Sequence, residues 1–225
     1  MRFAPYSFSS INLYSQCPKR FKYSKIDKIP SESTDRTALI KGGAVHDMLD
    51  KFPEASTFAA AQKYQPIVDN FIKSDLGKKY FSGSSTREYK FALNKKLEEC
   101  SYYDKANILV RGSIDYMCLI DGVLNLIDWK TGKYREEKYQ DYDQLIMYSI
   151  FIFLKYPHIN KIIISYVYVE HDLENRVELI RENLNNYIAE LINKIKTIEN
   201  DYEFEKNPTR LCSWCDYQLH CSKDV

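Results

Sequence analysis

A β-hairpin with a two-residue turn is the feature that most constrains the fold of this chain of 225 residues. The Asp-Gly pair at 121–122 separates two apolar segments, and Asp-Gly favours the type I′ turn that joins antiparallel strands. With these two residues as the loop, Ile120 pairs with Val123, and Asp115 lies directly opposite Asp128. Residues opposed in this way have Cβ atoms about 5 Å apart.

Two carboxylates at that separation repel, and each raises the pKa of the other unless a cation lies between them. Lys130 is two residues from Asp128 and therefore points to the same face of the strand. The pattern predicts a divalent-metal site with an adjacent lysine, which suits phosphodiester hydrolysis. On the hairpin alone, a solvated strand face is the simpler interpretation, and the rest of the sequence decides against it.

The composition limits the classes of protein that the chain can belong to. A hydrophobic fraction of 44% allows a sizeable core, yet no apolar stretch is long enough for a transmembrane helix. The N-terminus lacks the layout of a secretory signal, so we expect a cytoplasmic protein of prokaryotic or viral origin with no membrane association. A net charge of +1 argues against broad electrostatic coating of nucleic acid, and no phosphate-binding loop of a nucleotide-driven motor is present.

Six cysteines in a chain expected in a reducing compartment indicate metal binding or catalysis rather than disulfides. Cys212-x2-Cys215 is a strong ligand pair, because the two-residue spacer lets both thiolates face one metal. Cys221 is a natural third ligand, and Cys17 supplies a fourth from the other end of the chain. These four cysteines fit either a Zn²⁺ ion or a [4Fe-4S] cluster. For zinc, His220 is a further candidate ligand.

The hydrophobic periodicity predicts an α/β fold. Helices are expected from Ser9 or Ser10 to Cys17 and over 42–52, 57–76, 138–155 and 174–199, with strands over 86–97, 107–130 (the hairpin) and 161–170. This order predicts a central mixed β-sheet flanked by helices, with a helical N-terminal segment and a cysteine-rich C-terminal tail. We expect a single domain over 1–225, with a core at about 38–200, to which 1–37 and 201–225 are joined through the cysteines.

Four short motifs together resemble one known family. The motifs are Gly-x-x-His at 43–46, Gly-x-x-Asp at 112–115, Asp-x-Lys at 128–130 and Gln-x-x-x-Tyr at 144–148. In this order they resemble the RecB-type branch of the PD-(D/E)XK nuclease superfamily, which has a restriction-endonuclease-like core. The flanking cysteines resemble those of its iron–sulfur members, which include the AddB nuclease domain and the CRISPR-associated RecB-like exonucleases. The resemblance extends over nearly the whole chain.

The resemblance implies a role for each residue of the site. His46, Asp115, Asp128 and the carbonyl of Trp129 are expected to hold Mn²⁺ or Mg²⁺, for which carboxylates are suitable ligands and imidazole favours Mn²⁺. Lys130 is expected to orient the attacking water or help to deprotonate it.

Further residues are expected to contact the DNA. Gln144 and Tyr148 lie on one helical face, and the resemblance implies that they contact the backbone near the cut and assist catalysis. Glu88 is a weaker candidate for support of the active site. A basic segment interleaved with aromatic residues is either a solvated surface or a guide for the DNA strand, with Lys19, Arg20 and Lys22 as its candidate ligands of phosphate.

By the same resemblance, Cys17, Cys212, Cys215 and Cys221 hold a [4Fe-4S] cluster, with zinc as the alternative. A cluster held by these cysteines would link the two ends of the chain. If the loop-closure argument for disulfides applies, this link contributes on the order of 5 kcal/mol of stability. The implied activity is that of a metal-dependent exonuclease on single-stranded or end-frayed DNA. It would serve recombination, repair or CRISPR spacer processing, with a helicase or CRISPR integration proteins as partners. The alternatives are a non-catalytic DNA-end-binding subunit and a zinc-binding structural protein.

Overall fold

The computed structural model describes residues 2–31, 36–54, 56, 59–104 and 106–223. The chain forms two compact units. The terminal unit contains Met1–Arg36, Ala92–Arg111 and Ile188–Val225, and the sheet unit contains Thr37–Phe91 and Gly112–Tyr187. No helix in the described part of the chain has both the length and the apolar character needed to span a membrane.

The sheet is mixed and five-stranded. Its order is β1 (Ser85–Asn94), β2 (Ile108–Ile120), β3 (Val123–Lys130), β4 (Lys161–Tyr168) and β5 (Leu173–Ile180). Strands β3 and β4 run parallel, whereas β2–β3 and β4–β5 are antiparallel pairs. Parallel neighbours need a crossover, and α6 (Asp143–Lys155) provides it. The predicted fold class, a central mixed sheet flanked by helices, is confirmed.

The hairpin between β2 and β3 has the predicted turn. Asp121 and Gly122 both have positive φ, 51° and 76°, as the two central residues of a type I′ turn require. Ile120 pairs with Val123, and the register continues to the pair of Tyr116 and Ile127. One more step along this register places β2 residue 115 beside β3 residue 128, as the sequence predicts.

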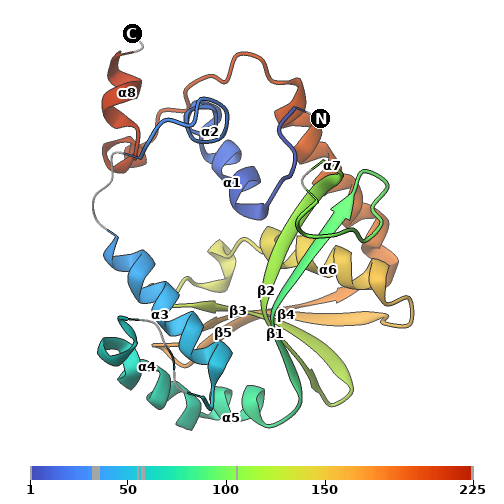
Figure 1. Ribbon diagram of the computed structural model, residues 1–225. Helices are drawn as coiled ribbons and strands as arrows, with labels where there is room; N and C mark the ends of the chain where they lie inside the picture. The colour runs from blue at the N-terminus through green and yellow to red at the C-terminus, as the bar shows by residue number, and fades with distance from the viewer. Residues whose placement is uncertain (1, 32–35, 55, 57–58, 105, 224–225) are drawn as a thin grey trace. The chain divides into compact units, whose positions relative to one another are not determined.

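Helices cover both faces of the sheet unit (Figure 1). One face packs against α3 (Thr37–Lys51), α4 (Ala61–Lys73) and α5 (Asp75–Phe81), and the core there includes Tyr116 of β2 and Trp129 of β3. Successive residues of a strand point to opposite faces, so the side chains of residues 115, 128 and 130 point to the other face, which α6 covers. On that face Gln144 of α6 contacts Asp128.

The terminal unit brings the two ends of the chain together. It contains α1 (Phe8–Gln16), α2 (Pro18–Phe21), the π-helical turn η1 (Lys22–Ile26), most of α7 (Leu184–Asn200), η4 (Arg210–Trp214) and α8 (Gln218–Lys223). Ser7 caps α1 by accepting a hydrogen bond from the Ser10 amide. Phe21 stacks on Phe204 near the opposite end of the chain, with ring centroids 6.2 Å apart. Aromatic packing thus joins the N-terminal and C-terminal segments of this unit.

The predicted helix over 174–199 is wrong in its first part. Leu173–Ile180 is strand β5, followed by a 3₁₀ turn, η3 (Arg181–Asn183), and only then by α7. Leu, Glu and Arg in this segment are compatible with a helix, but pairing with β4 overrides that local preference. The outer edge of β4 would otherwise have no partner.

Other helix boundaries also differ from the prediction. The first helix begins at Phe8, with Ser7 as its cap, and not at Ser9 or Ser10. The helix expected over 42–52 begins at Thr37, and the helix expected over 57–76 is two helices with a break at Ser74. Residues 57 and 58 lie outside the described residues. The helix expected over 138–155 begins at Asp143, after the 3₁₀ turn η2 (Glu137–Tyr139).

Candidate active site

Two carboxylates and a lysine form the centre of the site. The side chains of Asp115 and Asp128 are only 14% and 5% exposed. The Trp129 amide donates a hydrogen bond to Asp115 Oδ2 at 3.1 Å, and Gln144 Nε2 donates one to Asp128 Oδ1 at 2.7 Å. Asp128 Oδ2 lies 2.5 Å from Lys130 Nζ, and within the described chain nothing forms a hydrogen bond of good geometry with this oxygen.

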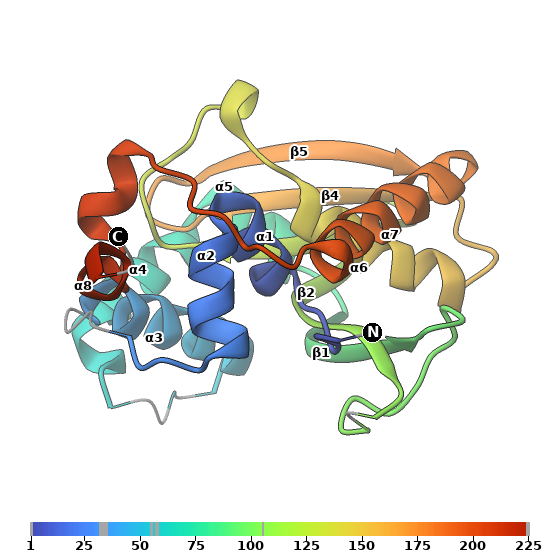
Figure 2. The ribbon, with the colours of Figure 1, turned by 90° about the horizontal axis from the view of Figure 1, so that it is seen from above.

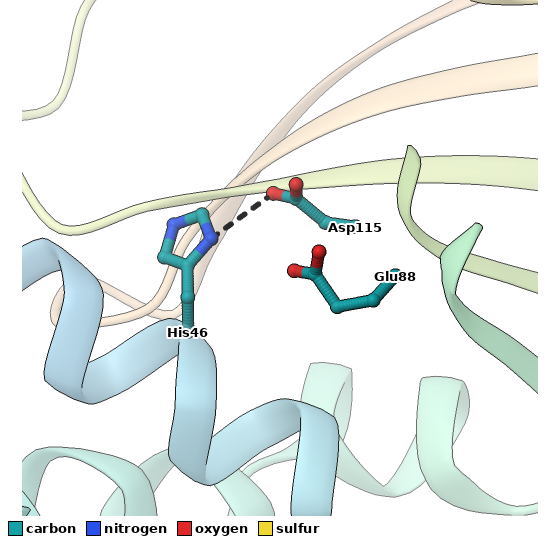
Figure 3. Close-up of side chains that lie close together, drawn as sticks. All are labelled: His46, Glu88 and Asp115. Carbon is teal, nitrogen blue, oxygen red and sulfur yellow. Dashed lines mark ion pairs between the residues drawn. The ribbon is translucent and has the colours of Figure 1, made fainter. Parts of the chain in front are cut away.

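His46 and Glu88 complete the group from two further elements. His46 extends from α3, with Nε2 2.8 Å from the Trp129 carbonyl oxygen and Nδ1 3.3 Å from Asp115 Oδ2. Glu88 lies on β1 with a positive φ of 45°, an uncommon backbone conformation for a residue other than glycine. Figure 3 shows the side chains of His46, Glu88 and Asp115 directed toward one another.

The pKa of Asp115 lies well above its usual range. Burial is the main cause, and the nearby charge of Asp128 adds to it. The Trp129 amide and Lys130 oppose the effect without cancelling it, and Glu88 reinforces it. An ionised Asp115 therefore costs free energy at neutral pH, and a bound cation would remove that cost.

The donor set fits a divalent cation. One ligand atom each from His46, Glu88 and Asp115 lie within 4.8 Å of one another, and the described chain has no other such group of three. Carboxylate oxygens with one imidazole suit Mn²⁺ or Mg²⁺. The predicted ligands His46, Asp115 and the Trp129 carbonyl are thus brought together. Asp128 adjoins them but lies outside the group of ligand atoms within 4.8 Å of one another. Glu88, which the sequence prediction named only as a weaker candidate, belongs to that group.

Gln144 and Tyr148 lie on one face of α6, as their spacing predicts. Gln144 Nε2 donates hydrogen bonds both to Asp128 and to Tyr148 Oη, the latter at 3.0 Å. Burial raises the pKa of Tyr148 above its usual value, so its phenol stays protonated at neutral pH. These two side chains support Asp128, and their contact with DNA stays a prediction.

Two residues that belong to the site were absent from the sequence prediction. Tyr166 of β4 pairs in register with Asp128, and Lys130 Nζ lies 4.6 Å from the centroid of the Tyr166 ring. Ser113 Oγ donates a hydrogen bond to Glu88 Oε2 at 3.1 Å. The signal for Tyr166 was its place on a buried strand, but its position beside Asp128 depends on a parallel pairing that no local pattern specifies.

Gly112 is expected to be intolerant of a side chain. A Cβ there would lie 2.7 Å from Cε1 of Tyr148 and 2.9 Å from Cε1 of Phe91. Gly112→Ala should therefore destabilise the fold by about 1–3 kcal/mol, the usual cost of overpacking. It should also weaken activity by displacing Tyr148.

Gly83→Ala is the matched control, because a Cβ at Gly83 meets no atom within 4 Å. Urea unfolding of both variants measures the difference. Equal stability of Gly112→Ala and the wild type would show that Tyr148 does not pack as the structure indicates.

Mn²⁺ is expected to stabilise the protein through Asp115. Because the folded-state pKa is raised, folding favours the protonated carboxyl, and stability falls as pH rises through that pKa. At pH 8 without metal, Asp115→Asn should therefore melt above the wild type, with the gap closing toward pH 4. At about a hundred times its dissociation constant, Mn²⁺ should raise the wild-type melting temperature by roughly 5–10 °C and leave the variant nearly unchanged.

Asp121→Asn is the control for this experiment, since residue 121 is exposed and asparagine tolerates positive φ. Differential scanning calorimetry over the pH range provides the comparison. A Mn²⁺ shift as large in Asp115→Asn as in the wild type would place the cation elsewhere.

The four predicted cluster cysteines line one pocket of about 470 Å³ in the terminal unit. Its walls include Cys17, Cys212, Cys215 and Cys221. Burial raises the pKa of the Cys215 thiol, and the nearby charges of Asp216 and Cys17 add to the effect. No three of these sulfur atoms, all of which the structure describes, lie within 4.8 Å of one another.

The cations predicted to bind DNA already have partners in the terminal unit. Arg20 forms an ion pair with Asp216 at 2.8 Å, and Lys22 forms one with Asp27 at 2.7 Å. Lys19 Nζ lies 5.4 Å from the Tyr23 ring centroid. The acidic partners reduce the positive charge of this surface, and its binding of DNA stays a prediction.

A comparison with known families assigns the chain to a class of nucleases. The sequence profile of the PD-(D/E)XK nuclease superfamily matches residues 5–222. The chain belongs to this superfamily, whose members use divalent metals, and membership of the superfamily is confirmed. The RecB-type branch and its iron–sulfur cluster stay predictions. A comparison with curated proteins finds no significant match.

Solved structures share the fold at low sequence identity. A candidate exonuclease from Eubacterium rectale is 14% identical, with a TM-score of 0.55 over 95% of this chain and 86% of that chain. The structure of SSO0001 is also 14% identical, with a TM-score of 0.42 over 96% of this chain and 85% of that chain. The first likeness shows a common fold.

Proposed function

We propose that the protein is a metal-dependent DNA exonuclease that acts on single-stranded or end-frayed DNA. The observation that carries the proposal is the pair of buried aspartates, Asp115 and Asp128, with His46 and Lys130 in contact with them. The fold of the Eubacterium rectale candidate exonuclease agrees with this function. As the RecB-type resemblance implies, the activity would serve recombination, repair or CRISPR spacer processing, with a helicase or CRISPR integration proteins as partners in the cytoplasm.

His46, Asp115, Asp128 and the Trp129 carbonyl, with Glu88 as a further oxygen donor, would hold Mn²⁺ or Mg²⁺. When bound, the cation would supply positive charge at the scissile phosphate and make water a better nucleophile. Side chains of the protein position the reacting groups and stabilise the developing charge.

Lys130 is the group that acts directly on the reacting atoms. Its side chain is 34% exposed and its ammonium lies against Asp128, a position from which it would contact the attacking water and a phosphate oxygen. It orients the water and stabilises the negative charge that develops on the phosphate. Gln144 donates to Asp128 and keeps that carboxylate in place, and the protonated phenol of Tyr148 can donate to the DNA backbone.

We further propose that Cys17, Cys212, Cys215 and Cys221 hold a [4Fe-4S] cluster. Four thiolates on one Zn²⁺, each about 2.3 Å from the metal, would lie about 3.8 Å apart. The four cysteines line one pocket, and their arrangement along the chain resembles that of the iron–sulfur nucleases, which favours the cluster over zinc. Bound there, the cluster would link segments from both ends of the chain within the terminal unit.

End-labelled DNA tests the exonuclease assignment. Linear single strands labelled at either end should be shortened in a Mn²⁺-dependent ladder, and the label that is lost first gives the polarity. Circular single strands of the same composition should survive. Cleavage of circles at the rate of linear strands would replace the exonuclease by an endonuclease, and binding of DNA ends with no cleavage would favour a non-catalytic subunit.

A further inference from the structure

The segment between β3 and α6 is tied to the active site at both ends. This segment, residues 131–142, begins directly after Lys130. It ends directly before α6, whose second residue is Gln144. Figure 2 shows it as a loop with a helical turn at its tip. Both ends of this loop, hereafter the β3–α6 loop, adjoin residues of the site.

The β3–α6 loop is anchored on β5 by a buried amide. Asn175 Nδ2 donates a hydrogen bond to the Arg135 carbonyl at 2.6 Å, and Tyr134 Oη donates one to Asn175 Oδ1 at 2.9 Å. Asn175 itself is only 3% exposed. Two hydrogen bonds thereby join the first half of the loop to β5.

The second half of the loop is anchored on β4. Tyr168 Oη donates to Gln140 Oε1 at 2.7 Å, and the ring of Tyr142 stacks on that of Tyr166 at 25°. Tyr166 is the ring that also contacts Lys130. The loop and the catalytic lysine thus share one aromatic support.

One large ring at the tip of the anchored loop projects into solvent. Tyr139 is 66% exposed, and Lys138 Nζ lies 4.9 Å from its ring centroid. Tyr134 is 38% exposed and meets Tyr168 edge-on. A rigid loop that exposes an aromatic face offers contact area with little loss of conformational entropy on binding.

The charge of the β3–α6 loop argues against simple attraction of phosphate. It carries three cations and three anions, and Lys138 is paired with Glu136 at 2.8 Å. Binding driven by phosphate contacts requires an excess of cations. Base stacking on an aromatic side chain requires none, and it tolerates any base.

We propose that the β3–α6 loop is a stacking surface for unpaired bases of the substrate strand, with Tyr139 as its platform. The inference rests on the proposed function and specifies its substrate class. Bases within a duplex already stack on one another, so their faces are not available to Tyr139. The loop therefore makes the site prefer single-stranded over duplex nucleic acid.

Fluorescence binding with a short oligodeoxynucleotide that carries 2-aminopurine tests the proposal. The experiment uses the full chain with Lys130→Ala and no added divalent cation, so that the probe stays intact. Adding Tyr139→Ala should weaken binding of the single strand on the order of tenfold and abolish the quenching that stacking produces. Tyr139→Trp should retain both, and the salt dependence should be the same in all three proteins.

Tyr103→Ala is the matched control, because Tyr103 is 76% exposed but belongs to the terminal unit. Unchanged binding and quenching in Tyr139→Ala would overturn the stacking surface, as would a wild-type chain that binds duplex as tightly as single strand. The two proposals fail separately. If Tyr139→Ala still cleaves DNA in a metal-dependent manner with unchanged KM, the nuclease activity stands and the stacking role of the loop is rejected. If the wild type stacks bases but cleaves no DNA, the stacking role stands and the nuclease activity is rejected.

Discussion

Lys130→Ala is expected to lower the rate of DNA cleavage at saturating Mn²⁺ by at least about a hundredfold. Removing one preorganised group that stabilises transition-state charge typically costs a factor of about 100–1,000. The ammonium lies 2.5 Å from Asp128 Oδ2, where it can also reach the attacking water. Asp115→Ala should have an effect at least as large, because it removes a carboxylate from the donor set.

Single-turnover kinetics with excess enzyme is the suitable measurement, since it separates cleavage from release of the product. Lys161→Ala is the matched control: Lys161 also forms an ion pair, with Glu178 at 3.1 Å, but on an exposed surface. Exposed pairs contribute about 0–1 kcal/mol, so this variant should fold and cut normally. A wild-type rate in Lys130→Ala would show that the lysine has no part in the reaction.

Cys212→Ser is expected to release iron and to destabilise the protein. The cysteines join segments from opposite ends of the chain, and closing a loop of that length is worth on the order of 5 kcal/mol if the argument for disulfides applies. Burial raises the pKa of the neighbouring Cys215 thiol, which disfavours the free thiolate. A bound metal would offset this cost, because a coordinated thiol is deprotonated outright.

Iron content, visible absorbance and urea unfolding of protein purified without oxygen measure this effect. Cys100→Ser is the control, because Cys100 lies in the same unit but does not line the cysteine pocket. Zinc in place of iron in the wild type would change the identity of the group. A stable Cys212→Ser variant with undiminished metal would eliminate the site.

The centre of the site could be predicted because its geometry depends on local chemistry. An Asp-Gly turn requires positive φ at both positions, which the structure has, and the turn sets the register of the whole hairpin. Register and strand parity then place Asp115, Asp128 and Lys130 on one face. The helical spacing of Gln144 and Tyr148 is likewise a local property, and both side chains meet at the site.

The remaining features depend on long-range pairing. Tyr166 contacts Lys130 only because β4 runs parallel to β3, and β5 forms a strand only because β4 offers it an edge. Glu88 is directed into the site by an uncommon backbone conformation that a glutamate does not signal. The β3–α6 loop was expected to be partly helical, and its anchor, Asn175, lies on the strand that the sequence did not predict.

The most direct test of the nuclease is hydrolysis of linear single-stranded DNA by the wild-type chain with its cysteine site filled, in Mn²⁺ and in chelator. We predict shortening of the strand in Mn²⁺, none in chelator, and recovery when Mn²⁺ is restored. Hydrolysis that continues undiminished in chelator would contradict a metal site at Asp115 and Asp128. No hydrolysis by folded, cysteine-loaded protein with either Mn²⁺ or Mg²⁺ would contradict the enzyme itself.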